Sequence, residues 1–249
     1  MTGERLKKIL LPLAFWLGVW WLCALLVGKD LILPAPASVA VRLWSLLPDP
    51  GFWWAVGASI GRVLAGFCLG SLLGVGLGAL TAVSPWGDAL LSPALRAVRT
   101  VPVVSLILLL FFSLPTHQVP TVVSALMVLP VVWRATRQGI AAADPRLLEL
   151  ADHYRLGLWR KLRLVYCPAA LSALASGWET ALGLCWKSGV AAEVLCQPKW
   201  GAGSQLQAAK AYLDAPGLFA WTVVLILLSL GMEWFLRLFL RAWRGGGKV

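Results

Sequence analysis

The feature that most constrains the fold of this chain is a succession of six apolar runs. The runs cover residues 9–27, 58–83, 101–114, 119–138, 169–195 and 217–240. A helix that crosses a lipid bilayer needs about 20 mostly apolar residues, and five of the six runs reach that length. The run 101–114 is shorter and is limited by Pro102 and Pro115, so it suits a re-entrant or buried segment equally well.

Composition supports a membrane protein and argues against a soluble one. Charged residues make up 13% of the chain, whereas soluble domains carry about 25%. The net charge of +11 does not predict nucleic-acid binding, because the positive residues lie in short loops between the apolar runs instead of forming one basic stripe. The sequence therefore predicts an all-α polytopic membrane protein, with residues 1–249 forming one transmembrane domain.

The distribution of positive charge predicts the topology, since cytoplasmic loops carry the excess of Lys and Arg. If all six runs span, sixteen of the 22 Lys and Arg residues lie on one side. They are Arg5, Lys7, Lys8, Arg96, Arg99, Arg134, Arg137, Arg146, Arg155, Arg160, Lys161, Arg163, Arg237, Arg241, Arg244 and Lys248. We therefore expect six transmembrane helices with both termini cytoplasmic, and we expect the run 101–114 to borrow a turn from the preceding helix.

Two other segments affect the topology. The N-terminal segment with its PAPAS sequence can be read as a signal peptide, but the run from Ile9 to Gly28 exceeds the roughly 7–15 residues of a signal core, so a retained first helix is favoured. The stretch from Leu31 to Ser59, with tryptophans at 53 and 54, predicts an external surface helix. Arg62 is interpreted as an interface anchor whose charged end reaches out of the membrane.

Four glycines in the second run predict a helix-packing face. Gly66, Gly70, Gly74 and Gly78 are spaced four residues apart, and four residues turn a helix by about 400°, so the glycines form one smooth stripe. Such a stripe allows another membrane helix to approach closely. The sequence does not say whether the partner helix belongs to the same chain.

The fifth run contains three charged residues, Glu179, Lys187 and Glu193. Charges inside a membrane are costly unless they face protein or water. Glu179 and Lys187 lie about 12 Å apart along a helix, so their partners must come from elsewhere. Structural pairing within a bundle and the lining of a polar pathway are both open interpretations.

No catalytic or metal-binding group is evident in the sequence. The five cysteines contain no CxxC pair, and the two histidines, His117 and His153, are far apart. We therefore expect neither an enzyme nor a metal or cofactor bound by this chain.

The most distinctive polar segment is LLELADHYRLGLWRKLRLVYCP, residues 147–168, within a predicted cytoplasmic loop at 139–168. Asp144 can cap a helix that starts at Pro145. Two apolar faces follow, one before and one after a turn expected at Gly157. A short amphipathic helical hairpin of this kind normally packs on the lipid surface or on a partner protein.

This loop resembles the EAA loop of binding-protein-dependent ABC importer permeases, whose motif runs E-A-A-x-x-x-G-x9-I-x-L-P. Glu149, Ala151 and Pro168 match the motif, and Val165 stands in the isoleucine position. LPAPASV, SIGRVLAGFCLGSLLGVGLGAL and WKSGVAAEVL elsewhere in the chain resemble the nitrate/sulfonate/taurine-type permeases.

The loop also departs from that motif at three positions. Leu150 replaces the first alanine, Cys167 replaces the leucine, and Arg155 stands in the glycine position, with Gly157 two residues later. The turn between the two short helices is therefore expected to be shifted or differently shaped.

The resemblance implies the type I ABC importer permease (MetI-like) fold in a bacterial plasma (inner) membrane. It implies that the loop docks on a cytoplasmic ATP-binding subunit and couples transport to ATP hydrolysis. The residues it assigns to the coupling loop are Glu149, Ala151, Arg155, Gly157, Trp159 and Pro168. Since the chain lacks a G-x-x-x-x-G-K-[ST] loop, ATP and Mg²⁺ are used by that partner.

Further partners follow from the same resemblance. An extracytoplasmic solute-binding protein delivers the substrate, and a second copy of the permease completes a homodimer with one coupling loop per ATP-binding subunit. A small anion or organic solute of the nitrate, sulfonate or taurine kind is the expected substrate. The alternatives are a membrane scaffold with a docking loop and a small ion-coupled carrier, although no inverted repeat is evident.

Overall fold

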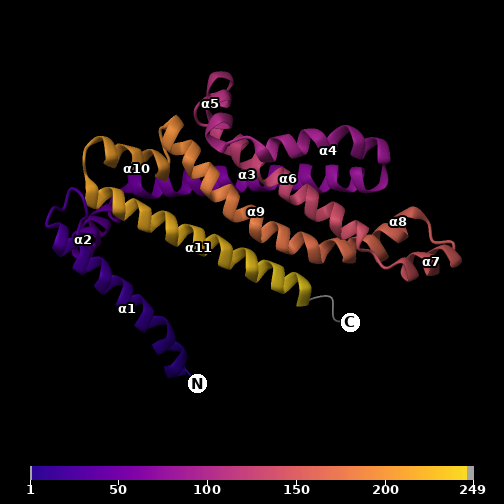
Figure 1. Cartoon of the computed structure of the whole chain (residues 1–249), viewed down its shortest axis with the longest axis horizontal. Coiled ribbons are helices and arrows are strands. Elements are labelled where there is room, and N and C mark those ends of the chain that lie inside the picture. Colours follow the sequence, from indigo (N-terminus) through magenta and orange to yellow (C-terminus); the bar gives the residue numbers. More distant parts are fainter. Residues whose placement is uncertain (1, 246–249) are drawn as a thin grey trace.

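A computed structural model describes residues 2–245, in which every element is helical. The helices are α1 (Thr2–Val27), α2 (Pro36–Leu46), α3 (Pro50–Val83), α4 (Pro85–Thr100), α5 (Val103–Ser113), α6 (Val119–Ala141), α7 (Pro145–His153), α8 (Leu158–Lys161), a π-helical turn η1 (Leu162–Tyr166), α9 (Cys167–Cys196), α10 (Ala202–Ala211) and α11 (Ala215–Gly245). Figure 1 shows an elongated bundle with α2 and α10 at one end and α7 and α8 at the other. The all-α prediction is confirmed.

Helices α3, α6 and α9 form the centre of the bundle, and the glycine stripe explains their close approach. Gly66, Gly70, Gly74 and Gly78 are all buried, and each packs directly on α6. A Cβ placed on Gly70 would lie 2.5 Å from the carbonyl oxygen of Ala125. The stripe is therefore used within the chain.

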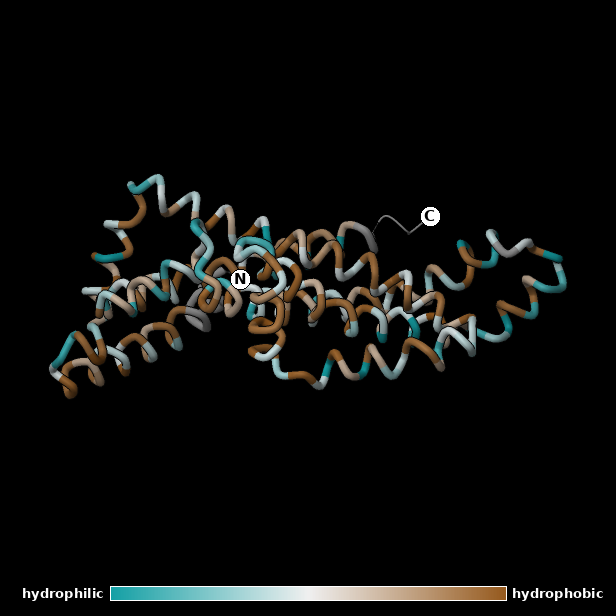
Figure 2. Tube along the Cα trace, turned by 90° about the horizontal axis from the view of Figure 1, so that it is seen from above, coloured by the Kyte–Doolittle hydropathy of each residue, from teal (hydrophilic) through white to brown (hydrophobic). Residues whose placement is uncertain are grey.

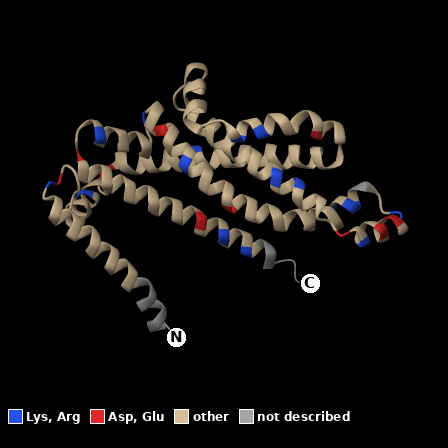
Figure 3. Cartoon of the chain, viewed as in Figure 1, with Lys and Arg blue, Asp and Glu red and all other residues tan. Residues whose placement is uncertain are grey.

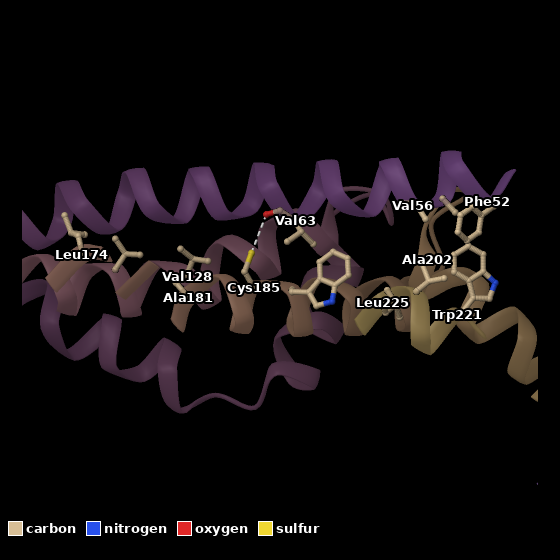
Figure 4. Close-up of a cluster of buried hydrophobic side chains, with 14 of the residues drawn as sticks. Phe52, Val56, Val63, Val128, Leu174, Ala181, Cys185, Ala202, Trp221 and Leu225 are labelled. Atoms are coloured by element: carbon tan, nitrogen blue, oxygen red, sulfur yellow. Dashed lines mark hydrogen bonds between the residues drawn. The ribbon is translucent and has the colours of Figure 1, made fainter. Parts of the chain in front are cut away.

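The N-terminal half of the same face of α3, with Phe52, Val56 and Val63, joins an apolar core shared with α6, α9, α10 and α11. The Cys185 thiol donates a hydrogen bond of 3.4 Å to the Val63 carbonyl, so α9 touches the backbone of α3. At the α2 end of the bundle, Phe52 packs on Trp221 of α11 with ring centroids 5.1 Å apart (Figure 4).

The expected membrane crossings are only partly reproduced. Within the described residues, α1, α3, α6 and α11 are each long and apolar enough to cross a membrane, and the bent pair α4–α5 raises the number to five if it forms one broken span. Apolar residues dominate these helices (Figure 2). Although α9 is 30 residues long, it is not among the four, so six crossings remain a prediction.

The third run differs most from its expectation. The residues between the second and third runs were assigned to a loop, but they form helix α4, which packs against α3 and α6 and carries Arg96 and Arg99. α5 does not extend α4, because the two axes meet at 103° around a break before Val103. Pro102 at this break lacks the N–H group that a continuous helix would use.

The segment 31–59 contains two elements instead of one surface helix. α2 is the expected short helix, and α3 already begins at Pro50, where the Asp49 carboxylate accepts a hydrogen bond of 2.8 Å from the Gly51 N–H. The tryptophans at 53 and 54 therefore belong to the first turns of the long helix α3. α1 diverges from the rest of the bundle (Figure 1), and 6% of its apolar window is buried.

Candidate functional site

The first candidate site is the charged hairpin formed by α7 and α8, residues 145–161. Its start is as predicted, because α7 begins at Pro145 and the Asp144 carboxylate accepts a hydrogen bond of 2.9 Å from the Arg146 N–H. A side-chain cap followed by proline stops the chain from continuing α6 as one straight helix. The hairpin lies at one end of the bundle, where positive and negative residues lie close together (Figure 3).

The turn of the charged hairpin is centred on Arg155 and not on Gly157. Arg155 has a φ of 50°, in the left-handed region. The Leu156 N–H donates to the Ala151 carbonyl and the Arg155 N–H to the Asp152 carbonyl, both at 2.9 Å. This is the Schellman pattern that ends many helices, with glycine usual at the left-handed position. The motif's glycine position thus keeps the glycine conformation but holds an arginine.

This geometry predicts that Arg155→Gly stabilises the turn. A left-handed conformation costs an L-residue about 1–2 kcal/mol, and the greater freedom of glycine in the unfolded turn offsets part of that gain. We expect amide hydrogen exchange across residues 150–160 to slow by roughly three- to fivefold, which corresponds to about 0.7–1 kcal/mol. Gly157→Ala is the matched control, because its φ is not positive and nothing lies within 4 Å of the added Cβ. Faster amide hydrogen exchange in Arg155→Gly than in the wild type would show that the left-handed conformation of Arg155 does not strain the turn.

The inner side of the charged hairpin is firmly packed. Ala151 of the EAA-like motif is buried in a small cluster with Ala143 and Val165, against which Leu148 and Leu156 pack. An ion pair between Lys161 and Asp152 joins the two arms. The hairpin is therefore braced against the ends of the two helices that it connects, α6 and α9.

Several apolar side chains of the charged hairpin are exposed. Leu150 is 54% exposed, and Leu147 is exposed on the same helix, α7. Trp159 of α8 is 78% exposed and lines an apolar pocket with Val75 of α3 and Ile140 of α6. Glu149 is exposed on α7. Exposed apolar side chains next to charged ones are typical of a surface that binds a partner.

A π-helical turn connects the charged hairpin to α9. The Cys167 N–H donates to the Leu162 carbonyl, five residues back. Pro168 stands in the first turn of α9, as predicted. A proline lacks an N–H and its ring collides with the carbonyl four residues earlier, so a wider turn here has a local cause.

The charged residues of α9 separate into two groups. Glu193 is 1% exposed, and its carboxylate binds the Arg62 guanidinium at 2.7 Å. It also accepts hydrogen bonds from the Ser59 hydroxyl at 2.6 Å and the Gly203 N–H at 3.1 Å. Arg62 is only 16% exposed, so its interpretation as an interface anchor is wrong: it neutralises Glu193 and fixes α9 to α3 and α10.

Glu179 and Lys187 are exposed on the surface of α9. As expected, they do not pair with each other, and no oppositely charged side chain of the described residues lies within 4.0 Å of either. Ser176 and Thr180 are exposed on the same helix. The described chain therefore leaves a polar strip on α9 open, whereas Glu193 is fully satisfied inside.

Comparison with known proteins identifies the family. Residues 70–245 match the family described as "Binding-protein-dependent transport system inner membrane component". A protein of Brucella melitensis named "Probable ABC transporter permease protein" is 30% identical over 94% of this chain and 93% of its own length. The aliphatic sulfonates transport permease protein SsuC of Escherichia coli is 31% identical over 76% of this chain and 75% of its own length.

Solved structures show the same fold. The chain is similar to a chain of the inward-facing MetNI methionine ABC transporter with a TM-score of 0.66 and 17% sequence identity, covering 78% of this chain and 98% of that one. The MetI-like fold is therefore confirmed for the helical bundle.

These similarities exclude the scaffold and the ion-coupled carrier as alternatives. Proteins of this family are transport subunits and not enzymes, and they act with an ATP-binding subunit and a solute-binding protein. The resemblance to nitrate/sulfonate/taurine-type permeases is confirmed as well. The chain belongs to the binding-protein-dependent transport family and is the multi-pass membrane permease subunit of an ATP-binding-cassette importer.

Proposed function

We propose that the charged hairpin (residues 145–161) couples this permease to its ATP-binding subunit. The observation that carries the proposal is the contrast between its two sides. Ala151 on the inner side is packed on Ala143 and Val165, while Leu150 and Glu149 of α7 are exposed. A hairpin whose inner side is packed on the bundle and whose exposed side chains are partly apolar can bind a partner and transmit the partner's movement to the bundle.

The connections of the charged hairpin give that movement a route. α6 leads into α7 within three residues, and α8 continues through the π-helical turn into α9. Both α6 and α9 belong to the centre of the bundle. A displacement of the hairpin by a closing ATP-binding subunit therefore reaches the two central helices directly.

We further propose that two copies assemble with their termini in the cytoplasm and that each chain crosses the membrane six times. α11 begins beside α10 and runs toward the end that carries the charged hairpin (Figure 1), which supports a cytoplasmic C-terminus. Glu179 and Lys187 on the open strip of α9 would be costly against lipid. A second copy facing this strip would enclose a polar pathway.

The substrate that we propose is a small anion. The family relative SsuC is named for aliphatic sulfonates, and Lys187 offers a positive charge on the open strip of α9. ATP and Mg²⁺ would be bound by the partner subunit and not by this chain.

Charge reversal at Glu149 tests the coupling. We expect Glu149→Arg to weaken binding of the ATP-binding subunit by at least about tenfold, or about 1.4 kcal/mol, and to abolish transport. Pull-down and transport in proteoliposomes measure the two effects. Asp30→Arg is the matched control, since it makes the same reversal of charge at an exposed position before α2. Undiminished ATPase binding and transport in Glu149→Arg would rule out a coupling role for this residue.

A further inference from the structure

An arginine-rich cavity lies between α4 and α6, and no residue of the charged hairpin or of α9 is among its lining residues. It has a volume of about 530 Å³ and is lined by Arg96, Arg99, Arg134 and Arg137 together with Leu95 and Trp133. Figure 3 shows positive residues on both helices where they lie near each other. A cavity of this size suits a small organic ligand.

One of the four arginines is already neutralised and helps to form a fixed wall. The Arg137 guanidinium binds the Asp88 carboxylate at 2.6 Å and lies 5.9 Å from the Trp133 ring centroid. The Trp133 indole N–H donates a hydrogen bond of 2.8 Å to the Thr81 hydroxyl. This wall is therefore held in place by α3 and α4 before any ligand binds.

The other three arginines have no such partner in the described chain. No carboxylate of the described residues lies within 4.0 Å of Arg96, Arg99 or Arg134. All three are exposed and line the cavity. Because no carboxylate of the described residues neutralises them, their guanidinium groups can bind an anion from outside the chain.

We propose that this cavity binds a small organic oxyanion, such as a sulfonate, with the anionic group on Arg96, Arg99 and Arg134 and the apolar body against Trp133 and Leu95. The planar guanidinium group matches the oxygens of sulfonate or phosphate with two parallel hydrogen bonds. The proposal rests on the proposed function, because it gives the transported anion a site in the half of the bundle nearer the charged hairpin.

The test uses the full-length permease purified in detergent, with 1-butanesulfonate as the probe. We expect calorimetric binding to the wild-type protein and at least tenfold weaker binding to Arg96→Gln/Arg134→Gln. Arg42→Gln, a single exchange of the same kind near α10, is expected to bind as the wild type does. Without the probe, the double variant is expected to melt no lower than the wild type, because it loses like charges that have no partner. Equal affinity in the wild type and the double variant would overturn the proposal, and so would a lower melting temperature of the ligand-free variant.

A lipid phosphate carries the same chemistry, so the source of the anion is tested separately. The purified wild type and the double variant are compared for bound phospholipid. If the wild type retains phospholipid that butanesulfonate does not displace, and the double variant lacks it, the cavity binds a lipid headgroup. That result would overturn the proposal of a soluble organic anion. The double variant is also expected to bind the ATP-binding subunit normally. Loss of anion binding with intact ATPase binding separates this proposal from the coupling role of Glu149.

Discussion

Glu193→Ala is expected to destabilise the folded permease by about 3–5 kcal/mol, because it leaves the Arg62 guanidinium buried without its counter-charge. The same change removes the acceptor for Ser59 and for the Gly203 N–H. Three helices meet at this carboxylate, so we expect α10 to separate from α3 and α9. Thermal unfolding in detergent, followed by intrinsic tryptophan fluorescence, measures the loss.

Two further variants separate the charge from the packing. Arg62→Met/Glu193→Leu replaces both partners with apolar side chains and is expected to be more stable than Glu193→Ala. Arg42→Ala breaks the ion pair with Asp214, in which the arginine side chain is 46% exposed, and is expected to cost less than about 1 kcal/mol. Equal losses in Glu193→Ala and Arg42→Ala would show that burial does not govern the Arg62–Glu193 pair.

The second large effect is expected at the glycine stripe. The Cβ of Gly70→Ala would lie 2.5 Å from the Ala125 carbonyl oxygen and 2.7 Å from the Val128 Cβ, so α3 and α6 must move apart. Overpacking of this kind costs about 1–3 kcal/mol, and Gly70→Leu is expected to prevent folding altogether. The yield of monodisperse protein and its melting temperature measure the effect.

Gly76 supplies the control on the same helix. Gly76 is exposed, and nothing lies within 4 Å of an added Cβ. Because alanine is a better helix former than glycine by about 1 kcal/mol, Gly76→Ala is expected to be neutral or stabilising. A loss of stability in Gly76→Ala as large as that in Gly70→Ala would contradict the packing argument.

Sequence rules predicted the features that depend on a few neighbouring residues. The Asp144 cap with Pro145 fixed the start of α7, and the four-residue spacing of glycines marked a packing face correctly. The identity of the partner helix was beyond those rules, because a smooth face specifies how closely a helix can approach but not which helix does so. In the structure the stripe belongs to α6.

Pairs that are distant in the sequence were the main source of error. Arg62 and Glu193 are separated by 131 positions, and hydropathy assigned each of them to its own helix. The arginines of α4 were assigned to a cytoplasmic loop because the positive-inside rule places clustered Lys and Arg outside the membrane. The ion pair of Arg137 of α6 with Asp88 of α4 is a further contact between separate helices that hydropathy does not reveal.

The motif glycine position illustrates a third limit. The departure at Arg155 suggested a shifted turn, with Gly157 as its centre. The left-handed residue instead stays at the motif's glycine position, Arg155. The N–H groups of Arg155 and Leu156 donate to carbonyls of the last turn of α7, and this pattern requires a left-handed residue at that position. A side chain can depart from a motif while the conformation that the motif encodes is retained.

The π-helical turn at Leu162–Tyr166 sets the angular position of the charged hairpin relative to α9. A π turn holds one residue more than an α turn, and one residue corresponds to about 100° of rotation about a helix axis. Deleting a single residue there would restore α geometry and swing Trp159 around the axis of α9 by that angle. The direction in which the charged hairpin points from α9 thus depends on one extra residue in a single helical turn.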